Sequence, residues 1–409
     1  MLERYRDFRR AGHLPTLLTA FLYFDFTFAI WVLNGALAPF IALEFGLDPE
    51  QKGFMVAVPI IAGALMRFPL GILSQYIGRK NAAMLEMSII TVCLLFGFFV
   101  VSSYHHVLGM GIALGAAGAS FGVALSLGSG SYPPKYKGLA MGIAGAGNSG
   151  TVLAMLFAPP LAMRYGWKAV YGIAAIPMLT ALLLLLIFAK EPTDQQHQEK
   201  KSLGEYLKIL FNRDVWVFNI IYAVTFGGFI GLSSFLPIFF FDHYHIPKQS
   251  VGQYAAVVVM MASMLRVVGG WLADKVGGLR LLYGLSATIL VTLTLAATLP
   301  ANPWVMVAIL AVTFSAMGAG NGALFQLVPL RFKASTTVAS SFIGEVGALA
   351  GGALPVIMGI SKQRTGSFAP GFMTGVILSL TVLTLLILMT RAWTSSWVGA
   401  GGKALPDSN

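Results

Sequence analysis

Two arginines lie inside long apolar segments of this 409-residue chain. Arg67 and Arg266 each lie near the middle of a segment long enough to cross a hydrocarbon core of about 30 Å. A charged side chain at that depth costs about 2.5–3.5 kcal/mol on insertion scales, so two cost on the order of 5–7 kcal/mol. A guanidinium is planar, permanently charged and forked, which suits the oxygens of a small oxyanion. The residues alone predict a site for a small anion between the two arginines.

A purely structural use of the arginines is the alternative. Each side chain would then reach toward a membrane interface or pair with a carboxylate. Reaching an interface is awkward for Arg67 and Arg266, because about ten further residues separate each from its next loop. Their matching placement also favours the anion site.

The composition of the chain places both arginines in a membrane protein. Hydrophobic residues make up 57% and charged residues 11%, with a mean hydropathy of +0.78, whereas soluble domains have about 25% charged residues. Uninterrupted apolar runs favour helices over barrel strands. The net charge of +11 comes from basic residues in short loops, so we expect no nucleic-acid partner. Cys93 is the only cysteine and the six histidines lack metal-ligand spacing, so we expect no disulfide, metal or cofactor.

We predict an all-α membrane protein with twelve transmembrane helices in two pseudo-symmetric six-helix halves. Residues 1–189 form the N-terminal half, 190–214 a cytoplasmic linker containing Lys200, Lys201 and Lys208, and 215–409 the C-terminal half with a short tail. The predicted spans are 15–43, 53–76, 82–103, 107–131, 137–163, 168–189, 215–241, 250–273, 280–299, 303–329, 335–360 and 370–391.

The distribution of positive charge predicts the orientation in the membrane. Of the 27 lysines and arginines, two lie inside predicted spans and 19 lie on the side of the N-terminus. Positive residues favour the cytoplasmic side. We therefore expect both termini in the cytoplasm. We also expect the chain to lie in the inner, or plasma, membrane and to be a monomer. The six on the opposite side are Lys52, Arg164, Lys168, Lys248, Lys362 and Arg364.

The two halves share sequence. The segment from Arg67 to Gly78 aligns with that from Arg266 to Gly277, 199 residues later at each matched glycine and at the arginine. A weaker match places 147–150 in span five on 344–347 in span eleven, 197 residues later. Parallel repeats of this kind belong to transporters that bind their substrate at the midplane between repeats.

The loops that follow the two arginines are predicted gates. The loop from Gly71 to Lys80, which contains Arg79, resembles the signature loop of the major facilitator superfamily, and so does the loop from Gly270 to Gly278. The first has Gln75 where an acidic residue is usual, and the second keeps Asp274. We therefore expect the second half to supply most of the charge that locks the gate.

Four further segments, at 21–26, 142–150, 267–274 and 320–329, resemble the nitrate/nitrite porter family of that superfamily. The resemblance covers most of the chain and implies the major facilitator fold, alternating access, and nitrate or nitrite as substrate. In that family the arginines of spans two and eight clamp the anion. The substrate site that the resemblance implies here consists of Arg67, Arg266, Asn148, Tyr222, Phe226, Phe121 and Asn321.

The glycine-rich run in span five also satisfies G-x-G-x-x-G. A dinucleotide site needs a preceding strand in a βαβ unit, and here the run lies inside a span, so we expect helix packing instead. Small residues allow close approach and leave room for helices to slide. The predicted packing glycines are Gly142, Gly145, Gly147, Gly150, Gly344 and Gly347.

Two acidic residues assigned to spans, Asp25 and Glu345, are candidates for coupling transport to protons. The repeat makes Glu345 the counterpart of Asn148. A carboxylate near the arginines would compete with the anion, whereas desolvation favours protonation on substrate entry. The structural alternative is a tie to a nearby hydroxyl or backbone group.

The residues leave the reaction open between proton symport and nitrate/nitrite exchange. An exchanger of organic anions such as oxalate or formate would use the same arginines. A membrane sensor on a transporter scaffold is an alternative of another class, but neither end of the chain offers a signalling extension. An enzyme is disfavoured because no nucleophile–base or metal-ligand set is visible.

Overall fold

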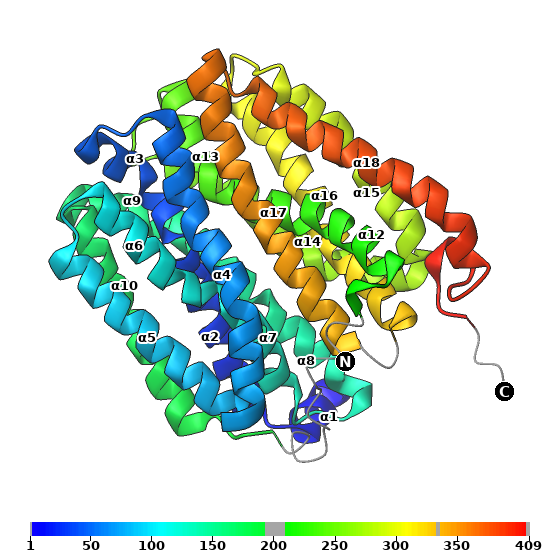
Figure 1. The fold of residues 1–409 in the computed structure, drawn as a ribbon. Helices are drawn as coiled ribbons and strands as arrows, with labels where there is room; N and C mark the ends of the chain where they lie inside the picture. The colour runs from blue at the N-terminus through cyan, green and yellow to red at the C-terminus, as the bar shows by residue number, and fades with distance from the viewer. Residues whose placement is uncertain (1, 193–208, 333–335, 406–409) are drawn as a thin grey trace. The chain divides into compact units, whose positions relative to one another are not determined.

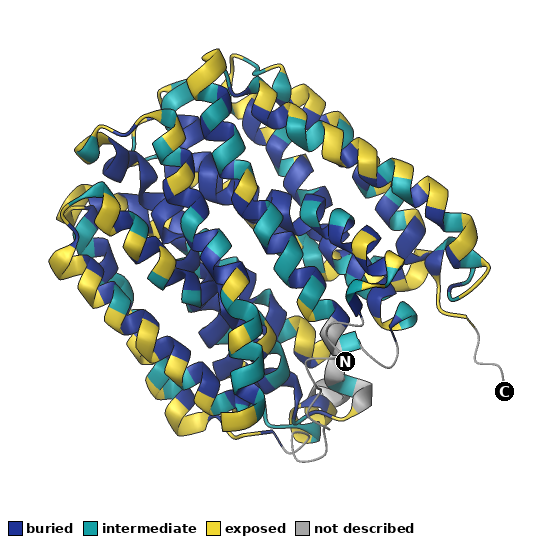
Figure 2. Ribbon diagram, viewed as in Figure 1, coloured by how far each residue is buried: buried dark blue, intermediate teal, exposed yellow. Residues whose placement is uncertain are grey.

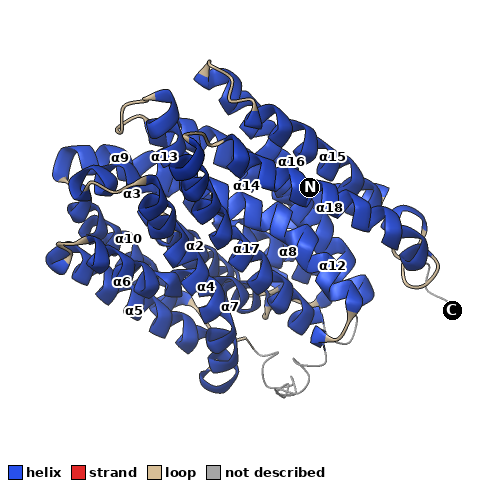
Figure 3. Ribbon diagram, turned by 45° about the horizontal axis from the view of Figure 1, so that its top comes forward, coloured by secondary structure: helices blue, strands red, loops and turns tan. Residues whose placement is uncertain are grey.

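The twelve predicted spans are all present as helices. A computed structural model describes residues 2–192, 209–332 and 336–405, and within those ranges every regular element is helical (Figure 3). Twelve of the helical stretches are long and apolar enough to cross a membrane. Their ends differ from the prediction by a few residues; the span predicted at 215–241, for example, runs over Arg213–Tyr244. Lys200, Lys201 and Lys208 of the predicted linker lie outside the described residues.

The chain forms two compact units. The first contains Met1–Phe45 and Val58–Lys201, and the second contains Gly46–Ala57 and Ser202–Asn409. The first turns of the second span therefore pack with the second unit, although they precede it by more than 100 residues in sequence.

The first unit is built around its earliest long helix. Its elements are α1 (Leu2–Ala11), α2 (Leu14–Trp31), α3 (Leu33–Phe45), α4 (Pro49–Ile77), α5 (Arg79–Val100), α6 (Tyr104–Leu114), η1 (Gly115–Ala119), α7 (Ser120–Ser129), α8 (Pro134–Gly145), η2 (Ala146–Ser149), α9 (Gly150–Tyr165) and α10 (Trp167–Phe188). Helix α2 packs against α7, α9, α10 and η2. Together with α3 it forms the first span, Leu14–Phe45, and 83% of the most apolar part of that span is buried. Helix α5 lies alongside α10 (Figure 1).

Two of these spans are interrupted by short 3-10 helices. The segment η1 has the sequence GAAGA and η2 has AGNS. Tighter 3-10 turns inside a longer helix often mark functional hinges. Both of these lie beside α2.

Helix α1 precedes the first span, where the sequence predicted no separate element. The ring of Phe8 stacks on Tyr132 at 4.8 Å between centroids. This contact belongs to a small buried cluster with Leu17, Ala140 and Ala144.

The second unit contains the remaining six spans. Its elements are α12 (Arg213–Tyr222), the π-helical η4 (Ala223–Gly227), α13 (Gly228–Tyr244), α14 (Val251–Val276), α15 (Gly278–Ala297), α16 (Pro303–Arg331), α17 (Thr336–Thr365), α18 (Ala369–Thr394) and η5 (Ala400–Gly402). The π segment η4 interrupts the first span of this unit, and such segments are frequent at functional sites.

Helices α14 and α16 approach each other backbone to backbone. A Cβ atom on Gly318 would meet the Ala262 carbonyl, one on Gly269 would meet Ala319, and one on Gly322 would meet the Arg266 carbonyl. Glycine at these positions allows the close approach.

The outward faces of both units are apolar. Figure 2 shows exposed residues along α5, α10 and α18. Phe99 is 76% exposed, Ile187 68% and Ile387 66%. A surface of this kind is suited to hydrocarbon rather than to water.

Candidate functional site

Arg67 lies ten residues before the end of α4, in the part of that helix that belongs to the first unit. Its Nε donates to the carbonyl oxygen of Gly118 at 2.9 Å. Its guanidinium carbon is 5.3 Å from the ring centre of Trp31 and 5.8 Å from that of Phe121. The predicted residues Arg67 and Phe121 are thus neighbours, and both aromatic contacts are within cation–π range.

Trp31 is a neighbour that the sequence reasoning misses. Its ring fills the space that side chains at Gly63 and Gly118 would need, and its indole N–H donates to the Pro59 carbonyl at 2.7 Å. It lies inside the apolar span predicted at 15–43, where nothing in its sequence context distinguishes it from a packing residue.

Asn148 lies in η2 and is 2% exposed. Its Oδ1 is buried without a hydrogen-bond partner among the described residues. Buried amides are normally paired, so an orphaned oxygen in the core of a unit is a feature of functional interest.

Arg266 lies ten residues before the end of α14, the same distance from its helix end as Arg67 in the first unit. Its backbone carbonyl faces Gly322 on α16. The neighbouring Asn321 is 1% exposed, and its Oδ1 likewise has no partner in the part of the chain that the structure describes. Arg67 and Arg266 therefore occupy equivalent positions in α4 and α14, as the alignment of the two halves predicts.

Tyr222 and Phe226 lie on either side of the start of η4. Their rings stack at 5.0 Å with an interplanar angle of 7°. The ring of Phe325 on α16 is nearly perpendicular to the Tyr222 ring, with 5.2 Å between the ring centres, and a Cβ atom on Gly347 would strike the Tyr222 ring. The two predicted aromatic residues thus form one stacked surface within the second unit.

The glycines predicted to pack differ in their surroundings. A Cβ atom on Gly150 would collide with the Asp25 carbonyl, and one on Gly147 would contact Phe24. By contrast, a Cβ atom on Gly142 would meet no described atom within 4 Å, and one on Gly145 only Leu125, at 3.8 Å. Gly344 is buried on α17. Close packing in span five is therefore confined to the end of the glycine run that faces α2.

Asp25 and Glu345 occupy different settings. Asp25 is 6% exposed and accepts a hydrogen bond from the hydroxyl of Ser149 at 2.6 Å, which is the hydroxyl tie named as the structural alternative. Glu345 is half-buried in the continuous helix α17.

Glu86 is a third acidic residue inside a span, and the sequence reasoning misses it. It is 3% exposed on α5, where it accepts a hydrogen bond from Tyr23. Its position within the span predicted at 82–103 is the signal that would have found it.

The two gate loops both turn through glycine. Gly78 has φ of +92° and Gly277 has φ of +99°, a region in which only glycine is unstrained. Their numbers differ by the repeat offset, which supports the alignment of the halves. Gly71 and Gly270 precede Gly78 and Gly277 by seven residues each, and they lie in the last two turns of α4 and α14.

The first gate loop obtains an acidic partner from elsewhere in the chain. The Glu191 carboxylate accepts the backbone N–H groups of Arg79 and Lys80, each at 2.8 Å. A carboxylate at a helix N-terminus is favoured by the helix dipole. Asp274, the acidic residue kept by the second loop, is exposed. Thus the first loop also has an acidic contact, although Gln75 replaces the usual acid in its sequence.

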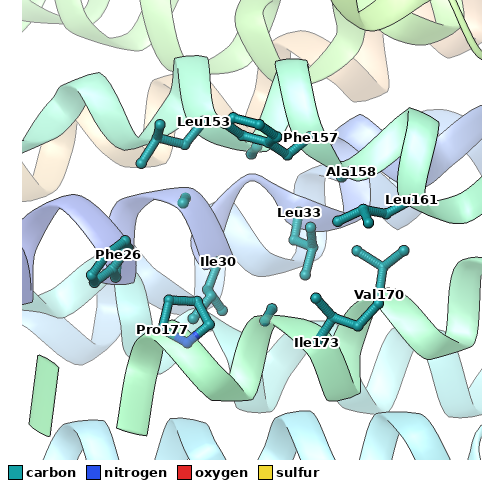
Figure 4. A pocket seen from close by; sticks show the side chains of 13 residues that line it. Phe26, Ile30, Leu33, Leu153, Phe157, Ala158, Leu161, Val170, Ile173 and Pro177 are labelled. Carbon is teal, nitrogen blue, oxygen red and sulfur yellow. The ribbon is translucent and has the colours of Figure 1, made fainter. Parts of the chain in front are cut away.

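Two cavities within the units are apolar. One of about 290 Å³ lies between α2, α3, α9 and α10 (Figure 4), and one of about 140 Å³ lies in the second unit beside η4 and α17. Figure 4 shows only hydrocarbon side chains around the first, among them Phe26, Leu33 and Phe157. An oxyanion would find no hydrogen-bonding side chain there, so this cavity is not the anion site.

Comparison with known proteins agrees with this architecture. The sequence profile described as Major Facilitator Superfamily matches residues 19–355. A "Nitrite extrusion protein" of Bacillus subtilis (strain 168) is 30% identical over 366 residues, which cover 88% of this chain and 91% of that protein. A "Probable nitrate/nitrite antiporter NarK1" of Thermus thermophilus is 28% identical over 386 residues, covering 87% of each.

A solved structure shares the fold. The crystal structure of a bacterial homolog to the human lysosomal transporter Spinster, in an inward-facing and occupied conformation, has a TM-score of 0.72 at 18% identity. The match covers 94% of this chain and 98% of that one.

Proposed function

This chain belongs to the major facilitator superfamily, and from that premise we propose that it carries nitrate and nitrite across a cell membrane by alternating access. The relatives named as nitrite and nitrate carriers, which align over most of the chain, support this substrate class. The observation that carries the proposal is a mid-helix arginine, Arg67, framed by Trp31 and Phe121 inside an otherwise apolar helix.

The proposed site uses one arginine from each half. Arg67 and Arg266 donate charge-assisted hydrogen bonds to the oxygens of one anion. The amides of Asn148 and Asn321 and the stacked surface of Tyr222 and Phe226 complete the pocket. Without the anion, the two positive charges repel; with it, they are screened and the halves close around it.

The cycle is either proton symport or exchange of nitrate for nitrite. Both use the same pocket, and the proposed orientation has both termini in the cytoplasm, on the positive side of the charge distribution. The protein acts as a monomer in the plasma membrane.

The test is anion flux into proteoliposomes that contain the purified full chain. Arg67→Lys and Arg266→Lys keep the charge but remove the planar fork, so each is expected to abolish nitrate and nitrite flux at normal expression. The matched control is Arg164→Lys in the last turn of α9, which should transport normally. Near-normal flux in either clamp variant contradicts the proposal, and strong competition by oxalate or formate indicates the organic-anion exchanger instead.

A further inference from the structure

A buried carboxyl group in the first unit has no role in the anion site. Glu86 is 3% exposed and Tyr23 is completely buried. The Tyr23 hydroxyl donates to Oε2 of Glu86, and Oε1 has no hydrogen-bond partner among the described residues. Glu86 thus has one neutral donor and one orphaned oxygen in a region sealed from solvent.

An ionised carboxylate in this setting is strongly disfavoured. Burial removes the hydration of the charge, and a stable buried charge needs an opposite charge and full hydrogen bonding. No ion pair with Glu86 occurs within residues 2–192, 209–332 and 336–405. The neutral, protonated acid removes the uncompensated charge, so the geometry favours a bound proton.

The other charged groups on α5 and α2 have partners of their own. On α5, Arg79 donates to the Ser126 carbonyl at 3.0 Å, and Lys80 donates to carbonyls at the end of α10. On α2, Asp25 accepts from Ser149. Neither η1 nor α7 carries a titratable side chain. The other titratable groups on elements packed against α5, or further along α5, are Tyr104, His105, His106, Lys168, Tyr171 and Cys93.

The hydrogen bond joins two helices that otherwise have little mutual contact. Tyr23 belongs to α2, which packs mainly on α7, α9, α10 and η2, whereas α5 packs mainly on α10. A displacement of α2 from α5 would break this bond and leave the carboxyl group open to water. Hydration then favours release of the proton, and return of α2 favours its uptake.

We propose that Glu86, together with Tyr23, is a proton-binding site that takes up and releases one proton in each transport cycle. The inference rests on the proposed transport of nitrate and nitrite. It adds that this transport is coupled to the movement of protons. It assigns the coupling role to Glu86 in place of Asp25 and Glu345. Binding forms an O–H bond on the carboxylate with a proton from water, and release breaks that bond.

Two assays in the same proteoliposomes separate this inference from the proposed function. Counterflow of labelled nitrate without a pH gradient measures anion transport alone. An internal pH dye then measures proton movement after external nitrate or nitrite is added. Absence of counterflow in the wild type would overturn the proposed function; counterflow without proton movement would overturn only the proton site.

Glu86→Gln keeps the shape of the side chain and removes its titration. We expect the ratio of proton movement to anion counterflow to fall to background. The matched control is Glu44→Gln, whose carboxylate in the same unit pairs with Lys168 at 3.3 Å and is 43% exposed; its ratio should equal that of the wild type. A wild-type ratio in Glu86→Gln overturns the proton site.

Tyr23→Phe provides a second test if Glu86→Gln does not reach the membrane. A hydroxyl that donates to a carboxylate favours the ionised form. Its removal should therefore move the midpoint of the pH profile of proton movement to higher pH. The infrared carbonyl band of the protonated acid should shift as well. An unchanged pH profile together with an unchanged band contradicts the assignment.

Discussion

The guanidinium carbon of Arg67 lies 5.3 Å from the ring centre of Trp31, and the indole N–H of Trp31 donates to Pro59 on the helix that carries Arg67. Trp31 therefore holds the backbone of α4 by a hydrogen bond and also contacts the guanidinium group of Arg67 on the same helix. In the proposed site, an anion that approaches Arg67 would meet a cation whose orientation is set before binding.

Trp31→Phe should weaken anion binding without abolishing transport. Phenylalanine has a smaller ring and no N–H group, so the hydrogen bond to Pro59 is lost and the cation–π contact with Arg67 is weakened. A cation–π contact contributes about 0.5–2 kcal/mol, which corresponds to an affinity about 2- to 30-fold lower. The measurement is the nitrate concentration for half-maximal flux, with Trp304→Phe, at a tryptophan that is 58% exposed, as control. An unchanged half-maximal concentration would show that Trp31 does not support the site.

Gly150→Ala should destabilise the first unit. Its Cβ atom would collide with the backbone of Asp25, and overpacking costs about 1–3 kcal/mol. We expect the melting temperature in detergent to fall by several degrees, at about 2–4 °C per kcal/mol. Gly142→Ala, in the same span but facing open space, is the matched control and should melt at or slightly above the wild-type temperature. Equal melting of both variants would contradict the packing described between Gly150, at the start of α9, and α2.

Charge reversal should test an ion pair in the second unit. Lys52 Nζ lies 2.7 Å from Asp242 Oδ2, and the two side chains are only 14% and 13% exposed. Lys52→Glu should impair flux and stability because two carboxylates then meet, whereas Lys52→Glu with Asp242→Lys should recover much of both. We expect a coupling free energy of about 0.5–3 kcal/mol from a double-mutant cycle of thermal stability. Additive effects of the two reversals would refute the pairing.

The start of α2 should respond to acid. The Nδ1 atom of His13 accepts the backbone N–H of Thr16 at 3.3 Å, and burial together with the charge of Lys190 lowers the pKa of His13 from 6.5. Because the unfolded chain binds this proton more readily, stability should fall as pH drops through about 6.5 toward the lower folded value. Below the folded value this contribution levels off.

The measurement is the melting temperature between pH 7.5 and pH 5, compared in wild type and His13→Asn. Asparagine also caps helices but does not titrate, so the variant should lose this part of the pH dependence. His105→Asn is the control at an exposed histidine, and its profile should match the wild type. An identical acid profile for His13→Asn would exclude His13 as the source.

Local patterns in the sequence predicted the membrane architecture well for a physical reason. Each span must satisfy its own backbone and present apolar side chains to lipid, so every helix is encoded by its own residues. Arg67 and Arg266 were identifiable because a mid-span charge is rare, and the repeat located them at the same depth. The helix α1 was missed because its polar, basic sequence lacks a span-length apolar run.

Contacts between distant segments could not be predicted in this way. Glu191 meets Arg79 across 112 residues of sequence, and no local pattern around Gln75 indicates that contact. Trp31 beside Arg67 is a similar case. The 3-10 and π segments also escaped prediction, since GAAGA, AGNS and AVTFG are all compatible with continuous helix, and only packing against neighbours selects the tighter or wider turn.

The glycine contacts between α14 and α16 have a mechanical consequence. With backbone against backbone at Gly318 and Gly322, no layer of side chains remains that could deform or slide between the two helices. We therefore expect α14 and α16 to move together as one rigid body. Because Arg266 lies on α14 and Asn321 on α16, the distance between their backbones should stay constant when these helices move relative to the rest of the unit.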